Sequence, residues 1–244
     1  MNPPTPPGSL NEQQATARDY DRWLSLNSLS SHWVRFWFAP RRTLWLNTQA
    51  RHLPAAASLQ ATDRILDIGC GYAGLLIHLH AALGMPRQPP EPMLEGLDSS
   101  SLMTLRASEE IHRRNLDSAI RVRAGFATAL PYGDGTFDAV LCAYVIKHLS
   151  DPALRRALHE VKRVLKPGGR FCVWEAVPSR YGFMNAWNMI LLQLGVSFIR
   201  MRTPEELMGL LEEEGFTIER PFGQGWYWFY PPLPRAGFIA SRPR

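Results

Sequence analysis

Cysteine is scarce in this chain: its 244 residues include only Cys70, Cys142 and Cys172. Each lies in or beside a stretch that we predict to be a buried strand, where cysteine packs as a small apolar side chain. Three cysteines in such places do not make the disulfide framework of a small secreted domain. We therefore expect a reducing, cytoplasmic environment.

Long apolar runs are also missing. None approaches the roughly 18 to 20 residues that cross a bilayer, so we expect no transmembrane helix. The first eight residues, Met1-Asn-Pro-Pro-Thr-Pro-Pro-Gly8, have no apolar core and are not typical of a signal peptide. Their Pro-rich, polar composition predicts a disordered tail over residues 1–14.

Neither sign of charge dominates, because 27 Lys and Arg face 22 Asp and Glu, for a formal charge of +5. The basic residues are scattered, which favours a solvated surface over a nucleic-acid interface. An anionic membrane surface stays open as a partner. The seven histidines show no paired ligand spacing, and His78 and His80 would point to different helix faces, so we expect no metal site.

The stretch from Arg64 to Gly74 is the strongest local signal. Ile65, Leu66 and Ile68 predict a short buried strand that contains Asp67. Gly69 and Gly71 then allow a sharp turn and close approach of a ligand, and a helix with leucines at helical spacing follows. A strand, a Gly-rich turn and a helix N-terminus predict a nucleotide-type cofactor site.

The cofactor itself is indicated by Asp67. The spacing Gly69-x-Gly71-x-x-Gly74 also fits a dinucleotide site, so a nicotinamide oxidoreductase is one alternative. An acid two residues before the first glycine, however, repels a pyrophosphate and suits a cationic ammonium. S-adenosylmethionine has that ammonium and no phosphate. A non-catalytic cofactor-binding or interaction protein is the other alternative.

Three motifs resemble the class I S-adenosylmethionine-dependent methyltransferases, and among them small-molecule enzymes of the type 11 kind. The first is Asp67-x-Gly69-x-Gly71, with Ala73 where a third glycine is usual. The second runs from Leu130-Pro131 to Phe137-Asp138, and the third is Leu165-Lys-Pro-Gly-Gly169. The resemblance covers residues 62–177 well.

The resemblance implies an α/β fold: a doubly wound, Rossmann-like sheet of seven strands with helices on both faces and the last strand antiparallel. Expected strands include 93–97 and 120–124, and a closing antiparallel pair over 216–219 and 237–240. Expected helices begin at Asp151-Pro152 and at a capping box, Thr203-Pro204-Glu205-Glu206.

The resemblance also implies where S-adenosylmethionine binds. Asp67 faces the ammonium and Asp98, at the end of the second strand, holds the ribose hydroxyls. In relatives an Asp binds the adenine amino group where this chain has Phe126, so we expect ring stacking there and backbone N–H groups at Phe126 and Ala127. The complete predicted cofactor set is Asp67, Gly69, Cys70, Gly71, Asp98, Ser99, Phe126, Ala127 and Ala143.

Tyr144 and His148 follow the fourth strand and are the candidate catalytic residues. Such strand ends open into the crevice of a doubly wound sheet. A histidine there can deprotonate a hydroxyl near neutral pH, or it can simply pack the turn. No metal is assigned.

We expect a helical N-terminal lid over residues 15–60 and a methyltransferase domain over 61–244 with an insertion at 178–202. Both the lid and the insertion are rich in Trp, Phe, Leu and Met; Trp23, Trp33, Trp37 and Trp187 are among them. Apolar walls on two sides predict a hydrophobic small-molecule acceptor, methylated on oxygen or carbon. The same residues are also compatible with ordinary core, a homodimer contact or a peripheral membrane contact.

Overall fold

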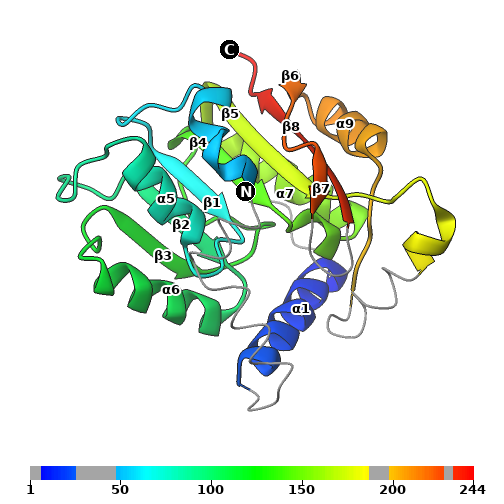
Figure 1. The fold of residues 1–244 in the computed structure, drawn as a ribbon, viewed down its shortest axis with the longest axis horizontal. Helices are drawn as coiled ribbons and strands as arrows, with labels where there is room; N and C mark the ends of the chain where they lie inside the picture. Colours follow the sequence, from blue (N-terminus) through cyan, green and yellow to red (C-terminus); the bar gives the residue numbers. More distant parts are fainter. Residues whose placement is uncertain (1–6, 26–47, 187–197, 228–232) are drawn as a thin grey trace.

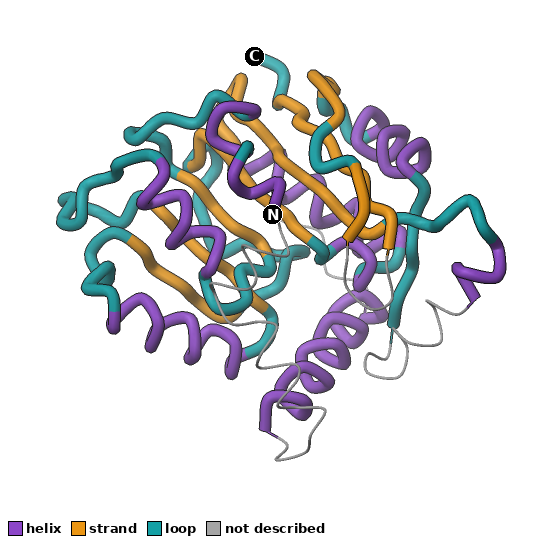
Figure 2. Tube along the Cα trace, in the orientation of Figure 1, coloured by secondary structure: helices purple, strands orange, loops and turns teal. Residues whose placement is uncertain are grey.

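The computed structural model describes residues 7–25, 48–186, 198–227 and 233–244. Figure 1 shows the arrangement of the elements, and Figure 2 separates helices from strands. The helices are α1 (Pro7–Ser25), η1 (Thr48–Arg51), α4 (Leu53–Ala56), α5 (Gly74–Ala82), α6 (Ser101–Arg113), η2 (Ile146–His148), α7 (Asp151–Val164) and α9 (Pro204–Glu213). The strands are β1 (Ile65–Ile68), β2 (Leu94–Asp98), β3 (Ile120–Ala124), β4 (Phe137–Ala143), β5 (Leu165–Ala176), β6 (Thr217–Pro221), β7 (Gly225–Tyr227) and β8 (Leu233–Ser241).

One mixed sheet carries the fold, with strand order β3-β2-β1-β4-β5-β8-β6. Strands β1 to β5 pair in parallel, and β8 is antiparallel to both β5 and β6. The predicted seven-stranded order with an antiparallel last strand is therefore confirmed. The short strand β7, which pairs with β8, is an addition that we did not predict.

Two apolar layers cover the two faces of the sheet. On one face α7 and α9 pack on alternate residues of β4 and β5, such as Val140 and Phe171. On the other face α4, α5 and α6 pack on the intervening residues, such as Leu141 and Trp174. The two-residue side-chain period of a strand produces this division, and it explains why these strands read as continuous apolar runs.

The start of β5 departs from a regular ladder. Leu165 pairs with Phe137, but the next pair along β4 is Ala139 with Arg170. The Lys-Pro-Gly-Gly segment therefore loops out, and Gly168 adopts φ +75° there. This motif therefore forms the turn between helix α7, which ends at Val164, and the regular part of β5.

Helix α1 differs from the prediction at its start. It includes residues 7–14, which we expected to belong to a disordered tail. Proline is well suited to a first helical turn, and Gln13 is buried against the domain through a hydrogen bond to Thr128. Burial and a tertiary contact thus outweigh the polar composition of this segment.

In Figure 1, α1 lies beyond the carboxyl ends of the parallel strands. The middle of the predicted lid, 26–47, and the middle of the predicted insertion, 187–197, lie outside the described residues. The division into tail, lid and domain stays a prediction.

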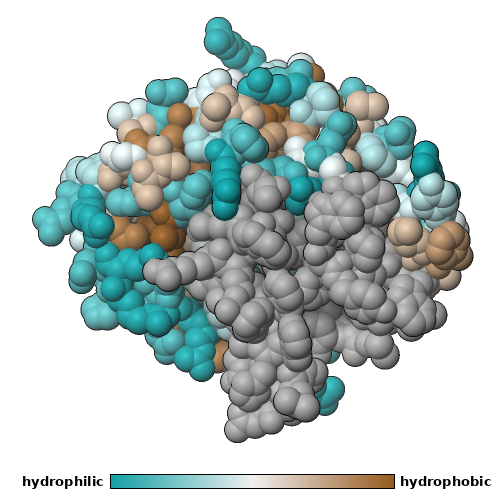
Figure 3. Space-filling model, viewed as in Figure 1, coloured by the Kyte–Doolittle hydropathy of each residue, from teal (hydrophilic) through white to brown (hydrophobic). Residues whose placement is uncertain are grey.

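The visible surface is mostly hydrophilic where the structure describes it (Figure 3). Among the described residues only Leu105, Tyr181 and Phe183 are large apolar side chains that are exposed. No described helix has the length and apolar character to cross a membrane.

The capping box at the start of α9 is formed as predicted. Thr203 Oγ1 accepts from Glu206 N–H at 3.2 Å, and the Glu206 carboxylate accepts from Thr203 N–H at 2.7 Å. We expect Thr203→Ala to lower the free energy of unfolding by about 1 kcal/mol. Glu205→Ala is the matched control, because Glu205 lies in the same turn but takes no part in the box. Urea titration measures both, and equal losses would contradict the assignment.

Candidate cofactor site

Asp67 is the third residue of β1 and lies between β2 and β4, with only 3% of its surface exposed. Within the described residues no hydrogen bond or cation stabilises its carboxylate. Burial, and after it the nearby charge of Asp98, raises the pKa of Asp67 well above that of an exposed aspartate. A buried carboxylate without a cation is costly, and a cationic ligand removes that cost.

The two glycines of the turn have different roles. Gly69 has φ +76°, and a Cβ added to it would lie 2.1 Å from Val145 Cγ2, so this position is closed by packing. Gly71 has φ +51°, and no heavy atom of the described residues lies within 4 Å of an added Cβ. Of the two, only Gly71 therefore faces space in which a ligand could approach the backbone, whereas we had expected both to do so.

Asp98, at the end of β2, is tied to this turn. Its Oδ2 accepts from Gly71 N–H at 2.9 Å and its Oδ1 accepts from Ser100 N–H at 2.9 Å. Burial raises the pKa of Asp98, and these two N–H groups act in the opposite direction. A carboxylate has about four acceptor sites, so Asp98 keeps at least one for a ribose hydroxyl beside the backbone N–H groups that it already binds. Glu95, the other acid of β2, lies inside the strand and forms an ion pair with Arg123 at 3.5 Å.

The other predicted cofactor residues surround the same end of the sheet. Burial raises the pKa of the Cys70 thiol, which therefore stays protonated. Ser99 follows Asp98, and Ala143 ends β4. The loop after β3 is joined to Asp98 through a Gly125 N–H bond to the Asp98 carbonyl at 2.9 Å, which brings Phe126 and the buried Ala127 to this edge. Adenine recognition by Phe126 and Ala127 stays a prediction.

The turn after β4 is held by an ion pair that we did not predict. Tyr144 adopts φ +59°, a conformation that a bulky side chain rarely takes and that often marks a functional turn. Lys147 Nζ donates to the Tyr144 carbonyl and lies 3.2 Å from Glu175 Oε1. Glu175 Oε2 also accepts from Lys147 N–H at 3.1 Å. The only sequence signal was an acid at the end of the fifth strand.

His148 is buried and its two ring nitrogens have distinct partners. Nδ1 lies 3.3 Å from the Phe198 carbonyl, which can only accept, so Nδ1 carries the proton. Nε2, 3.2 Å from the Tyr20 hydroxyl, is then the acceptor of that hydroxyl's proton. Burial, and after it the charge of Lys147, lowers the pKa of His148 to about 3. His148 is therefore neutral at physiological pH.

Helix α1 contributes residues that we did not assign to the site. Tyr20 contacts His148, and the neighbouring Asp21 accepts hydrogen bonds from Ser100 Oγ and from Leu102 N–H. A sequence signal existed, because residues 13, 16, 17, 20 and 24 follow helical spacing and four of them are buried. Sequence spacing predicts such a face but not the loops that it contacts.

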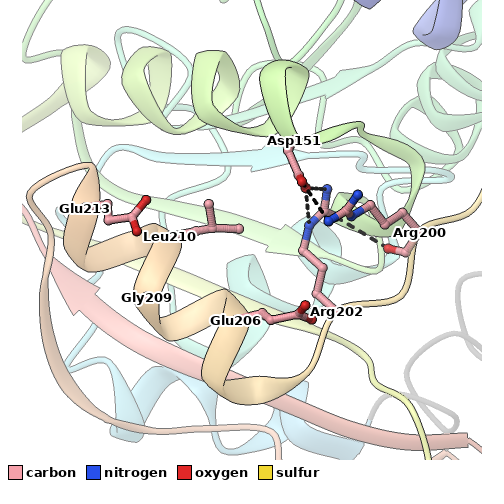
Figure 4. Close-up of a pocket in the computed structure, with 7 residues that line it drawn as sticks. All are labelled: Asp151, Arg200, Arg202, Glu206, Gly209, Leu210 and Glu213. Atoms are coloured by element: carbon pink, nitrogen blue, oxygen red, sulfur yellow. Dashed lines mark hydrogen bonds and ion pairs between the residues drawn. The ribbon is translucent and has the colours of Figure 1, made fainter.

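A separate cavity of about 300 Å³ lies between the start of α7 and α9 (Figure 4). Its lining residues are Asp151, Arg200, Arg202, Glu206, Gly209, Leu210 and Glu213, none of which belongs to the predicted cofactor set. Arg202 donates to the carbonyls of Ile146 and Leu149 at 2.9 and 2.7 Å, so it holds the η2 turn that carries His148. We therefore interpret the residues around this cavity as a support for the turn that carries His148, and not as the cofactor site.

The strand order, the carboxylates at the ends of β1 and β2 and the turn between them are those of a class I S-adenosylmethionine-dependent methyltransferase. Comparison with known proteins leads to the same class. Residues 65–169 match the family model described as a methyltransferase domain, so this part of the chain is similar to the methyltransferases that carry that domain.

The relatives show how far the similarity extends. An uncharacterized methyltransferase of Schizosaccharomyces pombe is 36% identical over 123 residues, which are 48% of this chain and 41% of that protein. A demethylmenaquinone methyltransferase of Lactiplantibacillus plantarum is 29% identical over 76% of this chain and 70% of its own length. The alignments with most of the curated relatives span about half of the relative.

Among solved structures, the YcgJ protein of Bacillus subtilis superposes with a TM-score of 0.65 over 81% of this chain and 99% of that one. Its sequence identity is 18%, so this likeness concerns the fold.

The unpaired charge of Asp67 predicts an unusual mutational effect. Asp67→Asn removes a buried charge that has no cationic partner within the described residues, so we expect the free energy of unfolding of the ligand-free protein to rise. The same change should weaken S-adenosylmethionine binding at least tenfold.

Asp63→Asn is the matched control. Asp63 is also a buried aspartate, but its carboxylate lies 2.6 Å from Arg170. Breaking a paired buried charge destabilises a fold, so this variant should lose stability. Urea unfolding and calorimetry measure both effects. An Asp67→Asn variant that loses as much stability as Asp63→Asn would show that Asp67 has a stabilising partner after all.

The low pKa of His148 predicts a pH effect on stability. In the unfolded chain this histidine takes up a proton near pH 6.5, whereas in the folded chain it stays neutral down to about pH 3. The unfolded state therefore binds one more proton in this window, and stability falls as the pH falls. We expect the unfolding free energy to depend on pH more steeply in the wild type than in His148→Gln, by up to about 1.4 kcal/mol per pH unit. Parallel curves between these pH values would contradict the burial of a neutral His148.

Proposed function

We propose that this protein transfers the methyl group of S-adenosylmethionine to a hydrophobic small molecule, on oxygen or on carbon. The observation that carries the proposal is the pair of carboxylates at two neighbouring strand ends, the buried Asp67 and the half-buried Asp98, beside the open side of Gly71. Two negative charges there favour a cationic ligand without phosphates and oppose the pyrophosphate of a dinucleotide.

The residues present fit S-adenosylmethionine. Asp67 is placed to accept hydrogen bonds from the ammonium, and Asp98 keeps acceptor sites for the ribose hydroxyls while it holds the Gly71 turn. When bound, S-adenosylmethionine supplies a sulfonium methyl group that a nucleophile attacks in line. The protein's contribution is then orientation and proximity, which can supply most of the rate.

His148 and Tyr144 remain the candidate catalytic residues. With a pKa near 3, His148 is a weak base, and its acceptor atom Nε2 is engaged by Tyr20. A weak base can assist only an acceptor whose proton is already acidic. We therefore propose an acidic hydroxyl, such as a phenol or enol, or an activated carbon as the methylated group, in preference to an alkyl alcohol.

The hydrophobic character of the acceptor rests on two arguments. Segments 26–47 and 187–197, which lie outside the described residues, contain Trp33, Trp37 and Trp187 among many apolar residues. One relative that aligns over most of its length is named for a quinone, demethylmenaquinone. The walls that we predicted from Trp23, Trp33, Trp37 and Trp187 stay a prediction, as do a homodimer, a peripheral membrane contact and a cytoplasmic location.

Calorimetry and turnover test the proposal together. We expect the wild type to bind S-adenosylmethionine and not NAD, and Asp98→Ala to weaken binding at least tenfold, or about 1.4 kcal/mol. Asp117→Ala, which removes an exposed carboxylate, serves as the control. Transfer of a labelled methyl group to a panel of phenols, enols and quinols should proceed in the presence of a chelator.

Binding of NAD instead would favour an oxidoreductase. Binding of S-adenosylmethionine without transfer to any acceptor class would favour a non-catalytic cofactor-binding protein. Restoration of activity by a divalent ion after chelation would contradict the expected absence of a metal.

A further inference from the structure

Helix α1 forms hydrogen bonds with each of the three segments that follow β2, β3 and β4. These are the loops that carry the predicted ribose, adenine and catalytic residues. The contacts are Asp21 with Ser100 and Leu102, Gln13 with Thr128, and Tyr20 with His148. Since Tyr20 and Asp21 are adjacent in sequence, one turn of α1 bridges the loops after β2 and β4.

Asp21 is linked to Asp98, the predicted ribose-binding carboxylate, through a single residue, Ser100. Ser100 donates its Oγ hydrogen to Asp21 and its N–H to Asp98 Oδ1, so a single residue holds both carboxylates. Ser100 is completely buried and is also the N-cap of α6, where its Oγ accepts from Met103 N–H at 3.0 Å. Its position is thus fixed by the helix, and loss of Asp21 leaves a buried hydroxyl donor without this acceptor.

The charge of Asp21 is felt at Asp98. It is one of the groups that raise the pKa of Asp98, after burial. Both carboxylates lie at the N-terminal end of α6, where free N–H groups and the helix dipole offset negative charge. Leu102 N–H, at 3.3 Å from Asp21 Oδ1, is one of these groups.

Tyr20 acts on the opposite side of the crevice. Its hydroxyl lies 3.2 Å from His148 Nε2, and the two rings pack edge to face with centroids 5.8 Å apart. The Phe198 carbonyl fixes the His148 tautomer from the other side. The Tyr20 hydroxyl is therefore the group that the lone pair of His148 Nε2 faces.

We propose that Asp21 and Tyr20 are positioning residues, Asp21 for the ribose carboxylate Asp98 and Tyr20 for His148, and that α1 couples these two sides of the site. The inference rests on the proposed function, because it assigns the ribose to Asp98. Cofactor binding at the β2 side should then change the surroundings of His148 at the β4 side, and the coupling should be reciprocal.

The test uses the full chain, S-adenosylmethionine as the probe and two readouts that need no acceptor. Calorimetry should show S-adenosylmethionine binding weakened about tenfold in Asp21→Ala and largely restored in Asp21→Asn, whose amide oxygen still accepts from Ser100. Nitrogen NMR of the His148 ring should show a shift of Nε2 when S-adenosylmethionine is added to the wild type, and little shift in Asp21→Ala. Tyr20→Phe should change the Nε2 signal of the free protein and, because the coupling is reciprocal, weaken cofactor binding by less than Asp21→Ala does.

Gln13→Ala is the control for general loosening of α1, because it removes the contact with Thr128 and neither of the other two. Equal losses of affinity in Gln13→Ala and Asp21→Ala, or no rescue by Asp21→Asn, would reduce Asp21 to helix docking and overturn the inference. So would unchanged affinity in Asp21→Ala. A wild type that does not bind S-adenosylmethionine would overturn the proposed function, and this inference with it.

Discussion

Asp67 is buried with no cation beside it among the described residues, and this is the constraint on which the rest of the site depends. A carboxylate at the centre of a parallel sheet, close to a second carboxylate, makes the ligand-free fold less stable than an amide would. Proteins keep such a cost where a function needs the charge. The surrounding elements are then arranged so that a cation can reach it: β1 ends in a glycine turn, and Gly71 leaves its ligand side open.

Asp98 connects this turn to the elements around it. It fixes Gly71 with one oxygen and Ser100 with the other, and Ser100 in turn fixes Asp21 of α1. On the other side, Arg202 and the Lys147–Glu175 pair hold the turn that presents Tyr144 and His148. The site is therefore built from loops braced by buried polar groups, on strands whose positions the apolar layers determine.

The sequence predicted what depends on local chemistry. Strand β3, the capping box of Thr203 and Glu206 and the place of Asp98 at the end of β2 all follow from short patterns with one physical reading. Long-range contacts were not predictable in this way. Gly69 packs against Val145, which lies 76 residues later in the sequence. Tyr20 contacts His148, which lies 128 residues later. The tail prediction failed over residues 7–14 because composition does not reveal the contact of Gln13 with Thr128.

Proton release on cofactor binding tests the central claim most directly. If Asp67 has a raised pKa in the free protein and meets an ammonium in the complex, binding must lower that pKa and release a proton at mildly acidic pH. Calorimetry of S-adenosylmethionine binding in buffers with different ionisation enthalpies measures this release. The account predicts proton release that grows as the pH falls towards the raised pKa and that is much smaller in Asp67→Asn. Equal proton release in the wild type and in Asp67→Asn, or none in either, would contradict it.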